Sequence, residues 1–327
     1  MPHTPILPRT SLRTALVALA LSAAGSAGAE PEPMLRNGFR LEPAAVPVTA
    51  IIRGGPPRDG IPALDHPTAL PAARADWRDE DRVLGTVAGG EARAYPLAIL
   101  EWHELVNDTL GGEPILVSYC PLCGSGLVFG RRVAGATRSF GVSGLLYRSD
   151  LLMYDRGTES LWSQIAARAV TGPLVGERLR LLRVRVESWG AWRRHHPDSS
   201  VLSRETGHDR DYASSPYGDY ATSSRTFGTP KPDPRYPPKT RTVGLRVPGQ
   251  AARAYPAPEL LRAGGAIAER FAGHAVRIAY DAERDSFHVE APPEVEVVEG
   301  YWFAWASFHP DTGVFRATGE PAPRARE

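Results

Sequence analysis

The chain has 327 residues, of which 42% are hydrophobic, so it is long enough to form one large domain or two smaller units with a sizeable core. Its formal net charge is only +1, which argues against nucleic acid or an anionic membrane surface as the partner. The 32 glycines and 31 prolines predict many turns and short elements in place of long helices.

The first 29 residues have the pattern of a secretory signal peptide. Arg9 and Arg13 precede an apolar run at 15–21, and the sequence A-G-A at 27–29 matches a cleavage site of the A-x-A kind. The apolar run is too short to span a bilayer. We therefore expect cleavage near Ala29 and a periplasmic or secreted protein without a membrane span.

The next part of the chain is expected to form an extended arm followed by a β-rich lobe. Residues 30–76 are rich in proline, alanine and glycine, which is typical of a segment that wraps around a body. In the predicted lobe, residues 77–206, apolar and polar residues alternate at 83–87 and at 179–186, as they do in half-buried strands. Residues 97–107 instead show the apolar spacing of a helix.

A long loop separates this lobe from a second one that repeats part of its sequence. The loop, residues 207–241, is too long for an ordinary connection and is either a covering loop or a domain linker. Residues 252–256 (ARAYP) then copy residues 92–96, and further matches follow in the same order. We therefore predict a second, degenerate lobe at 242–318, followed by a tail at 319–327.

Together these elements predict an α+β fold, mostly antiparallel β-sheet with short helices, in two similar lobes that arose by internal duplication. Aligning the two copies places Asp281 and Arg284 at the positions of the two cysteines of the first copy. A residue needed only for folding such a lobe should occur in both copies. The difference between the copies therefore favours a functional role for the cysteines.

The two cysteines of the chain, Cys120 and Cys123, form a C-x-x-C turn between two strand-like runs. In an exported chain such a pair usually forms a disulfide. The C-P-x-C-G pattern is also typical of metal knuckles, in which the glycine permits a positive φ. Exchange-active thiols are the third interpretation, although such thiols usually open a helix, and here a Gly-Ser-Gly run and a strand follow.

For the metal interpretation, the turn supplies two of the four ligands that a closed zinc site needs. His103 could approach the sulfur atoms in a compact strand–helix–strand unit and is the predicted third ligand. Met153 and His208 are candidates for the fourth position on their chemistry alone. Two thiolates and one imidazole suit copper or an open zinc position, and copper is preferred.

Several motifs along the chain occur together in a characteristic order. They are W-H-E-x-x-N-D at 102–108, Y-C-P-L-C-G at 119–124, F-G-V-S-G-L-L-Y at 140–147, M-Y-D-R at 153–156, L-W-S-Q at 161–164 and R-D-Y at 210–212. These motifs resemble the bacterial family called domain of unknown function 3179, over nearly the whole chain after residue 29. The resemblance implies that His103, Cys120 and Cys123 are family features. It also implies that further residues belong with them, namely Ser163, Gln164, Arg210 and Tyr212.

The sequence thus predicts an exported thiol-based protein that binds copper or zinc, with an unknown protein or a small molecule as its partner. The first alternative is a periplasmic thiol–disulfide redox enzyme that uses the same pair. The second is a non-catalytic envelope or interaction protein in which the pair is a structural disulfide.

Overall fold

The structure is a computed structural model that describes residues 1–2, 34–229 and 231–317. The chain divides into two units, Met1–Glu32 and Pro33–Glu327, and the second is described below. The predicted signal peptide and the tail at 319–327 lie outside the described residues, apart from residues 1–2. In the described part of the chain, no helix is both long enough and apolar enough to cross a bilayer.

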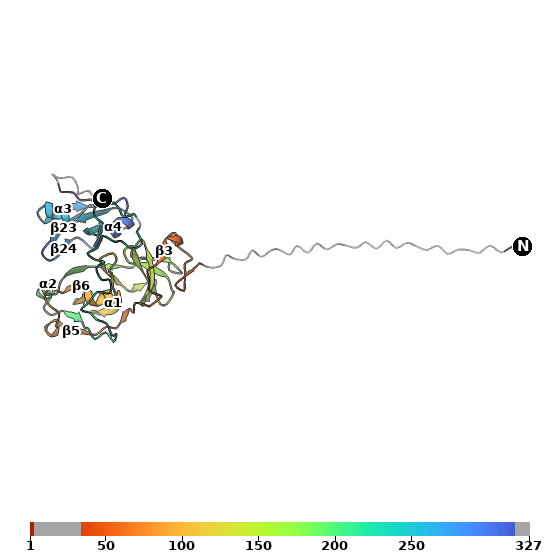
Figure 1. The fold of residues 1–327 in the computed structure, drawn as a ribbon, viewed down its shortest axis with the longest axis horizontal. Helices are drawn as coiled ribbons and strands as arrows, with labels where there is room; N and C mark the ends of the chain where they lie inside the picture. Colours follow the sequence, from red (N-terminus) through yellow and green to blue (C-terminus); the bar gives the residue numbers. More distant parts are fainter. Residues whose placement is uncertain (3–33, 230, 318–327) are drawn as a thin grey trace. The chain divides into compact units, whose positions relative to one another are not determined.

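In the described residues the fold is mostly β, with five main sheets arranged as a five-bladed β-propeller. The predicted α+β fold with two lobes was therefore wrong. Figure 1 labels several of the strands and the short helices. The described residues contain four α-helices of only six or seven residues: α1 (Leu97–His103), α2 (Trp189–His195), α3 (Ala257–Arg262) and α4 (Trp302–Phe308). Each of them directly follows a strand, so the helices connect strands and do not form a layer of their own.

Three of the sheets are built from residues before the long loop. Sheet 1 has the order β18 (Val184–Ser188), β6 (Arg82–Ala88), β7 (Glu91–Pro96), β19 (Ser200–Leu202) and β5 (Ala69–Pro71). Sheet 2 has the order β17 (Leu181–Leu182), β10 (Ser125–Gly130), β9 (Glu113–Cys120), β8 (Leu105–Leu110) and β4 (Leu64–Asp65). Sheet 3 has the order β16 (Arg168–Thr171), β15 (Leu161–Ser163), β14 (Asp150–Asp155), β13 (Phe140–Tyr147) and β3 (Ile51–Arg53).

The C-terminal part of the chain supplies the other two sheets. Sheet 4 has the order β25 (Glu296–Tyr301), β20 (Arg241–Arg246), β21 (Ala252–Pro256) and β26 (Gly313–Val314). Sheet 5 has the order β22 (Ala266–Phe271), β23 (His274–Asp281) and β24 (Ser286–Glu290). Smaller elements are β1 (Leu35–Arg36) with β2 (Phe39–Arg40), β11 (Arg132–Val133) with β12 (Ala136–Thr137), and the 3-10 helices Val48–Ala50 and Ala72–Arg74.

The repeated sequence folds twice in the same strand order. The run β18-β6-β7-β19 of sheet 1 corresponds to β25-β20-β21-β26 of sheet 4, and the last strand of each run pairs in parallel. Likewise, β8-β9-β10 of sheet 2 corresponds to β22-β23-β24 of sheet 5. The two copies are thus not separate lobes, because each supplies two sheets of one propeller.

The arm before residue 77 adds one short strand to each of the first three sheets. β3 pairs with β13, β4 with β8 and β5 with β19. Each of these short strands covers the edge of its partner strand, which removes an exposed edge that could pair with another chain. The arm thereby contacts each of the first three sheets, including sheets 2 and 3, which carry the cysteine turn and Asp150.

Asn107 of β8 joins sheet 2 to sheet 3. Its buried side chain donates to the carbonyl oxygen of Phe140 and accepts from the Phe140 amide, both at 2.8 Å, and it also donates to Asp65. The Asn107 side chain thus forms both backbone hydrogen bonds of Phe140 that a neighbouring strand would otherwise form, and in this way it links the two sheets.

Replacing Asn107 by alanine is expected to lower the free energy of unfolding by roughly 2–4 kcal/mol, because two buried backbone groups of Phe140 lose their partner. Urea denaturation measures this. Asp65→Ala removes the third contact and leaves the Phe140 pair intact, so it should cost less than half as much. Equal losses in the two variants would contradict the bridging role of Asn107.

Candidate metal centre

The cysteine turn joins β9 to β10 within sheet 2. Cys120 is the last residue of β9, and its carbonyl oxygen accepts from the Cys123 amide at 3.1 Å. Gly124 follows with a φ of +61°. A Cβ atom at this position would lie 2.8 Å from the ring of Tyr301. Glycine is therefore required here both by the backbone conformation and by the close approach of an aromatic ring.

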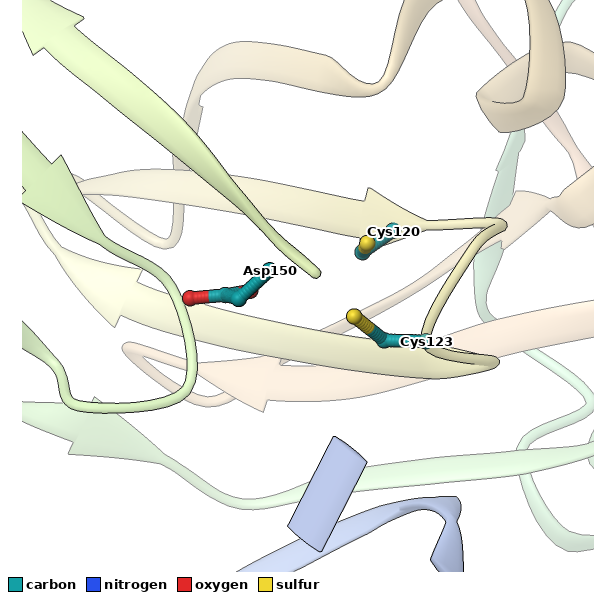
Figure 2. A group of neighbouring side chains, drawn as sticks. All are labelled: Cys120, Cys123 and Asp150. Atoms are coloured by element: carbon teal, nitrogen blue, oxygen red, sulfur yellow. The ribbon is translucent and has the colours of Figure 1, made fainter. Parts of the chain in front are cut away.

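Three buried side chains from two sheets converge at this turn (Figure 2). Cys120 and Cys123 are free thiols that are 1% and 0% exposed. Asp150, the first residue of β14 in sheet 3, is 0% exposed. The two Sγ atoms and one carboxylate oxygen of Asp150 all lie within 4.8 Å of one another. Figure 2 shows both sulfur atoms on the side of the turn that faces Asp150. No disulfide joins the two cysteines.

The carboxyl group of Asp150 has one satisfied oxygen and one unsatisfied oxygen. Its Oδ2 accepts from Ser163 Oγ at 2.7 Å and from the Ile165 amide at 3.0 Å. Its Oδ1 is buried and has no hydrogen-bond partner among the described residues. Burial raises the pKa of Asp150 to about 7. The Oδ1 atom is therefore available to accept a hydrogen bond or to bind a ligand.

The hairpin that carries Asp150 also positions a backbone oxygen at the cysteines. Arg148 and Ser149 turn β13 back into β14 with positive φ angles of 55° and 70°. The carbonyl oxygen of Ser149 then accepts from the Cys123 thiol at 3.2 Å. This hairpin pairing, and not the local sequence around the cysteines, brings Asp150 to the site.

Gln164 holds the two strands of the cysteine turn together. Its Oε1 accepts from Ser125 Oγ at 2.7 Å, and its Nε2 donates to Ser118 Oγ at 2.7 Å. Ser163 binds Asp150 directly, so two of the four residues implied by the family resemblance, Ser163 and Gln164, lie at the cysteine turn. Met153 is buried in the same hydrophobic cluster as the two cysteines. These contacts support the positions of Cys120, Cys123 and Asp150.

Burial, followed by the contact with Cys120, raises the pKa of the Cys123 thiol. Exchange-active cysteines have the opposite property, a lowered pKa and access to solvent. Burial therefore favours the neutral form of the Cys123 thiol. A metal ion at the same place would displace its proton, since thiolates are the metal-binding form.

The other predicted site residues form a second group. His103 is buried; its Nδ1 lies 2.7 Å from the Pro62 carbonyl oxygen, and its Nε2 lies 2.7 Å from Tyr212 Oη. The ring of His208 lies 5.1 Å from that of His103, and Arg210 stands over the ring of Trp102. Burial lowers the pKa of His103 to about 4, so the ring is neutral. The cluster that the structure brings together contains Asp150, and His103 is not part of it.

A mainly apolar cavity of about 540 Å³ borders the cysteine turn. Leu122, which stands between the two cysteines, forms part of its wall, as do Glu104 and Tyr217. Tyr217 Oη donates to Glu104 Oε1 at 2.6 Å, and burial raises the pKa of Glu104 to about 7. Within the W-H-E motif at 102–104, His103 was the predicted site residue, whereas Glu104 is the residue that lines the cavity.

The long loop at 207–241 covers both the cavity and the cysteine turn. Tyr217 binds Glu104, Tyr220 Oη donates to the Leu122 carbonyl oxygen at 3.1 Å, and the Ser149 hydroxyl donates to the Phe227 carbonyl oxygen. The loop therefore contacts the turn directly through Tyr220 and contacts neighbouring segments through Tyr217 and Phe227.

The second copy of the repeat has an ion pair where the first has its thiols. Asp281 pairs with Ser286 as Cys120 pairs with Ser125, so the two turns occupy the same place in their sheets. Arg284 donates to Asp281 at 2.6 Å on the protein surface. The turn itself can thus be closed without cysteines, which supports a role for the thiols other than folding.

The raised pKa values of Asp150 and Glu104 make the stability of the metal-free protein depend on pH. The folded state holds these protons more tightly than the unfolded state, so the stabilisation is fully present below about pH 4 and is lost as pH rises through about 7. Urea denaturation at pH 5 and pH 8 should show the loss, and Glu104→Gln should reduce it by about 3 kcal/mol. The exposed Glu91→Gln is the matched control. An unchanged pH dependence in Glu104→Gln would contradict the assignment.

Comparison with known proteins adds the family. A family model described as "Protein of unknown function (DUF3179)" matches residues 58–296, which is well over half of the chain. The matched range includes the cysteine turn, Asp150 and the loop that covers them. Neither the curated proteins nor the solved structures that were compared give a match. The chain therefore belongs to the DUF3179 family.

Proposed function

We propose that this protein binds a metal ion, preferably zinc, through Cys120, Cys123 and Asp150. The observation that carries the proposal is the buried Asp150 Oδ1, which has no hydrogen-bond partner in the described part of the chain and belongs to a carboxyl group beside two free thiols. Two thiols and one carboxyl group, each of which can lose a proton, are buried together at this place. A divalent cation would compensate the negative charge that they would carry.

The donor set fits zinc by both spacing and chemistry. With Zn–S distances of about 2.3 Å, tetrahedral ligand atoms stand roughly 3.8 Å apart, and the three candidate donors lie within 4.8 Å of one another. Zinc accepts thiolate and carboxylate ligands together, whereas Cu(I) is soft and selects sulfur ligands. The sequence favoured copper because it assigned an imidazole to the third position. A carboxylate in that position changes the preference.

Zinc held by these three residues would supply Lewis-acid chemistry or bind an exogenous ligand at a remaining position. Residues that contact the three candidate ligands, or the strands that carry them, would hold the ligands in position. Ser163 and the Ile165 amide hold one oxygen of Asp150, and Gln164 ties the strands that carry the cysteines. Ser163→Ala is expected to weaken metal binding by about 10–100-fold, as is typical when a residue supporting a metal ligand is lost.

Cobalt substitution in the reduced full chain tests the proposal directly. We expect one equivalent of Co²⁺ to bind and to show thiolate-to-cobalt charge-transfer absorption, which zinc then abolishes by displacement. Asp150→Asn should keep the sulfur-based absorption but bind more weakly, measured by competition with a chelator. Failure of the reduced protein to bind either metal would overturn the proposal. An unchanged affinity in Asp150→Asn would remove the aspartate from the site.

We also propose that the protein is exported, on the evidence of the signal-peptide pattern in its first 29 residues. In an oxidising compartment, a bound metal would keep the neighbouring thiols from forming a disulfide. Intact-mass measurement of the protein isolated from its native host is expected to give a chain that begins near Glu30. A mass corresponding to the uncleaved chain would contradict this.

A further inference from the structure

We propose that the cavity beside the cysteine turn binds an apolar organic amine, with its ammonium group against Glu104 and Glu101. This proposal does not depend on the metal, because none of the three candidate metal ligands is needed for the contacts described below.

The cavity has the size and the lining of a small-molecule site. Its volume of about 540 Å³ lies within the range of roughly 300–1,000 Å³ that is usual for such sites. It is formed where the arm, the end of α1, the cysteine turn, sheet 3 and the long loop meet. Most of its wall is apolar, including Ile61, Leu122, Val142, Leu146, Leu151 and Phe227. A hydrocarbon group would therefore be transferred from water into a mainly apolar environment.

The charges of the cavity are unevenly distributed. Glu104 is 7% exposed and Glu101 is half-buried, and both line the cavity. Within the described residues, neither carboxyl forms an ion pair with a lysine, arginine or histidine. Arg210, the basic residue of the wall, is exposed and donates to the Asp209 carbonyl oxygen at 3.3 Å. The buried charged groups of the cavity are thus acidic.

The backbone of Glu104 is held in a conformation that non-glycine residues rarely adopt, with φ 57° and ψ −37°. Its amide donates to the Leu100 carbonyl oxygen at 2.7 Å, and its carbonyl oxygen accepts from the Tyr119 amide at 2.8 Å. Such positions cost free energy and tend to occur at functional sites. Here the conformation ends α1 and places the carboxyl in the cavity wall beside Tyr217.

An ammonium group fits the buried carboxyl groups of this cavity better than a neutral or an anionic group does. A charge-assisted hydrogen bond to a buried carboxylate is stronger than a bond between neutral groups. It would also offset the desolvation that raises the pKa of Glu104. The apolar remainder of the ligand would contact the leucine side chains of sheet 3.

Three matched probes test the proposal: 2-phenylethylamine, 2-phenylethanol and 3-phenylpropanoate. They would be titrated by calorimetry into the full chain at pH 8, where Glu104 is ionised. We expect the amine to bind about tenfold more tightly than the alcohol, and the acid to bind most weakly, because a hydrogen bond to a charged group is stronger than one between neutral groups. Tightest binding of the acid, equal binding of amine and alcohol, or absence of saturable amine binding would each overturn the proposal.

Two variants locate the ammonium group. Glu104→Gln should abolish the preference for the amine over the alcohol, and the half-buried Glu101→Gln should reduce it even if Glu104→Gln folds poorly. The exposed Glu91→Gln is the matched control and should behave as the parent. An undiminished preference in both Glu101→Gln and Glu104→Gln would also refute the assignment. Repeating the titration with Cys120→Ser/Cys123→Ser separates this test from the metal proposal, because amine binding should persist in that variant.

Discussion

Cys123→Ser is expected to weaken zinc binding by about a hundredfold or more, and Cys120→Ser/Cys123→Ser is expected to abolish it. Zinc binding by small four-ligand sites is worth about 10–16 kcal/mol, so a single ligand accounts for roughly 3 kcal/mol. Serine keeps the size of the side chain but does not deprotonate to an anion near neutral pH. Chelator competition with reduced protein measures the affinity of each variant.

The same titrations decide between the aspartate and the histidine as the third ligand. His103→Gln should leave zinc affinity unchanged, because both ring nitrogens of His103 contact Pro62 and Tyr212. Met153→Leu serves as a second control, since it removes the thioether from the same hydrophobic cluster while keeping its volume. A loss in His103→Gln as large as that in Cys123→Ser would instead restore the histidine to the site.

Zinc should also stabilise the folded protein. A ligand present at a thousand times its dissociation constant adds about 4 kcal/mol to the free energy of unfolding. The double serine variant should gain nothing from added zinc, whereas Met153→Leu should gain as much as the parent. Equal stabilisation of the parent and the double variant would mean that the ion binds elsewhere.

Gly85→Ala and Gly244→Ala are each expected to lower the free energy of unfolding by about 3 kcal/mol, at the upper end of the cost of overpacking a core. A Cβ atom at either position would stand 2.2 Å from an indole ring, that of Trp192 or that of Trp305. Both tryptophans are almost fully buried, so neither ring can easily move away. Urea denaturation of the two variants tests the expectation.

The two glycines also test the equivalence of the repeats. Gly85 pairs with Ala94 and Gly244 pairs with Ala254, which is the same register in sheets 1 and 4. Gly313→Ala is the control, because a Cβ there meets its nearest atom at an ordinary distance of 3.8 Å. It should change stability by less than about 0.5 kcal/mol. If only one of Gly85→Ala and Gly244→Ala is destabilising, the two helices α2 and α4 do not pack in equivalent ways.

Several parts of the site could be read from local sequence. The C-P-L-C-G run predicted a turn with a glycine at positive φ, and Gly124 has that conformation. The segment at 97–107 predicted a helix, of which α1 covers the first seven residues before β8 begins. Asp150 was not predicted as a ligand, because its nearest sequence neighbours give no sign of the cysteines, which lie about thirty positions away.

By itself, the sequence determined the short strands, the cysteine turn and the repeated strand order, because alternation and turn residues act over a few neighbouring positions. Only the tertiary structure decided that the two copies share one propeller, since the packing of sheet against sheet depends on contacts between distant segments. The same kind of contact carries Asp150 to the two thiols and directs His103 to Tyr212. The sequence therefore indicated the thiols as candidate ligands, whereas the fold places Asp150 beside them.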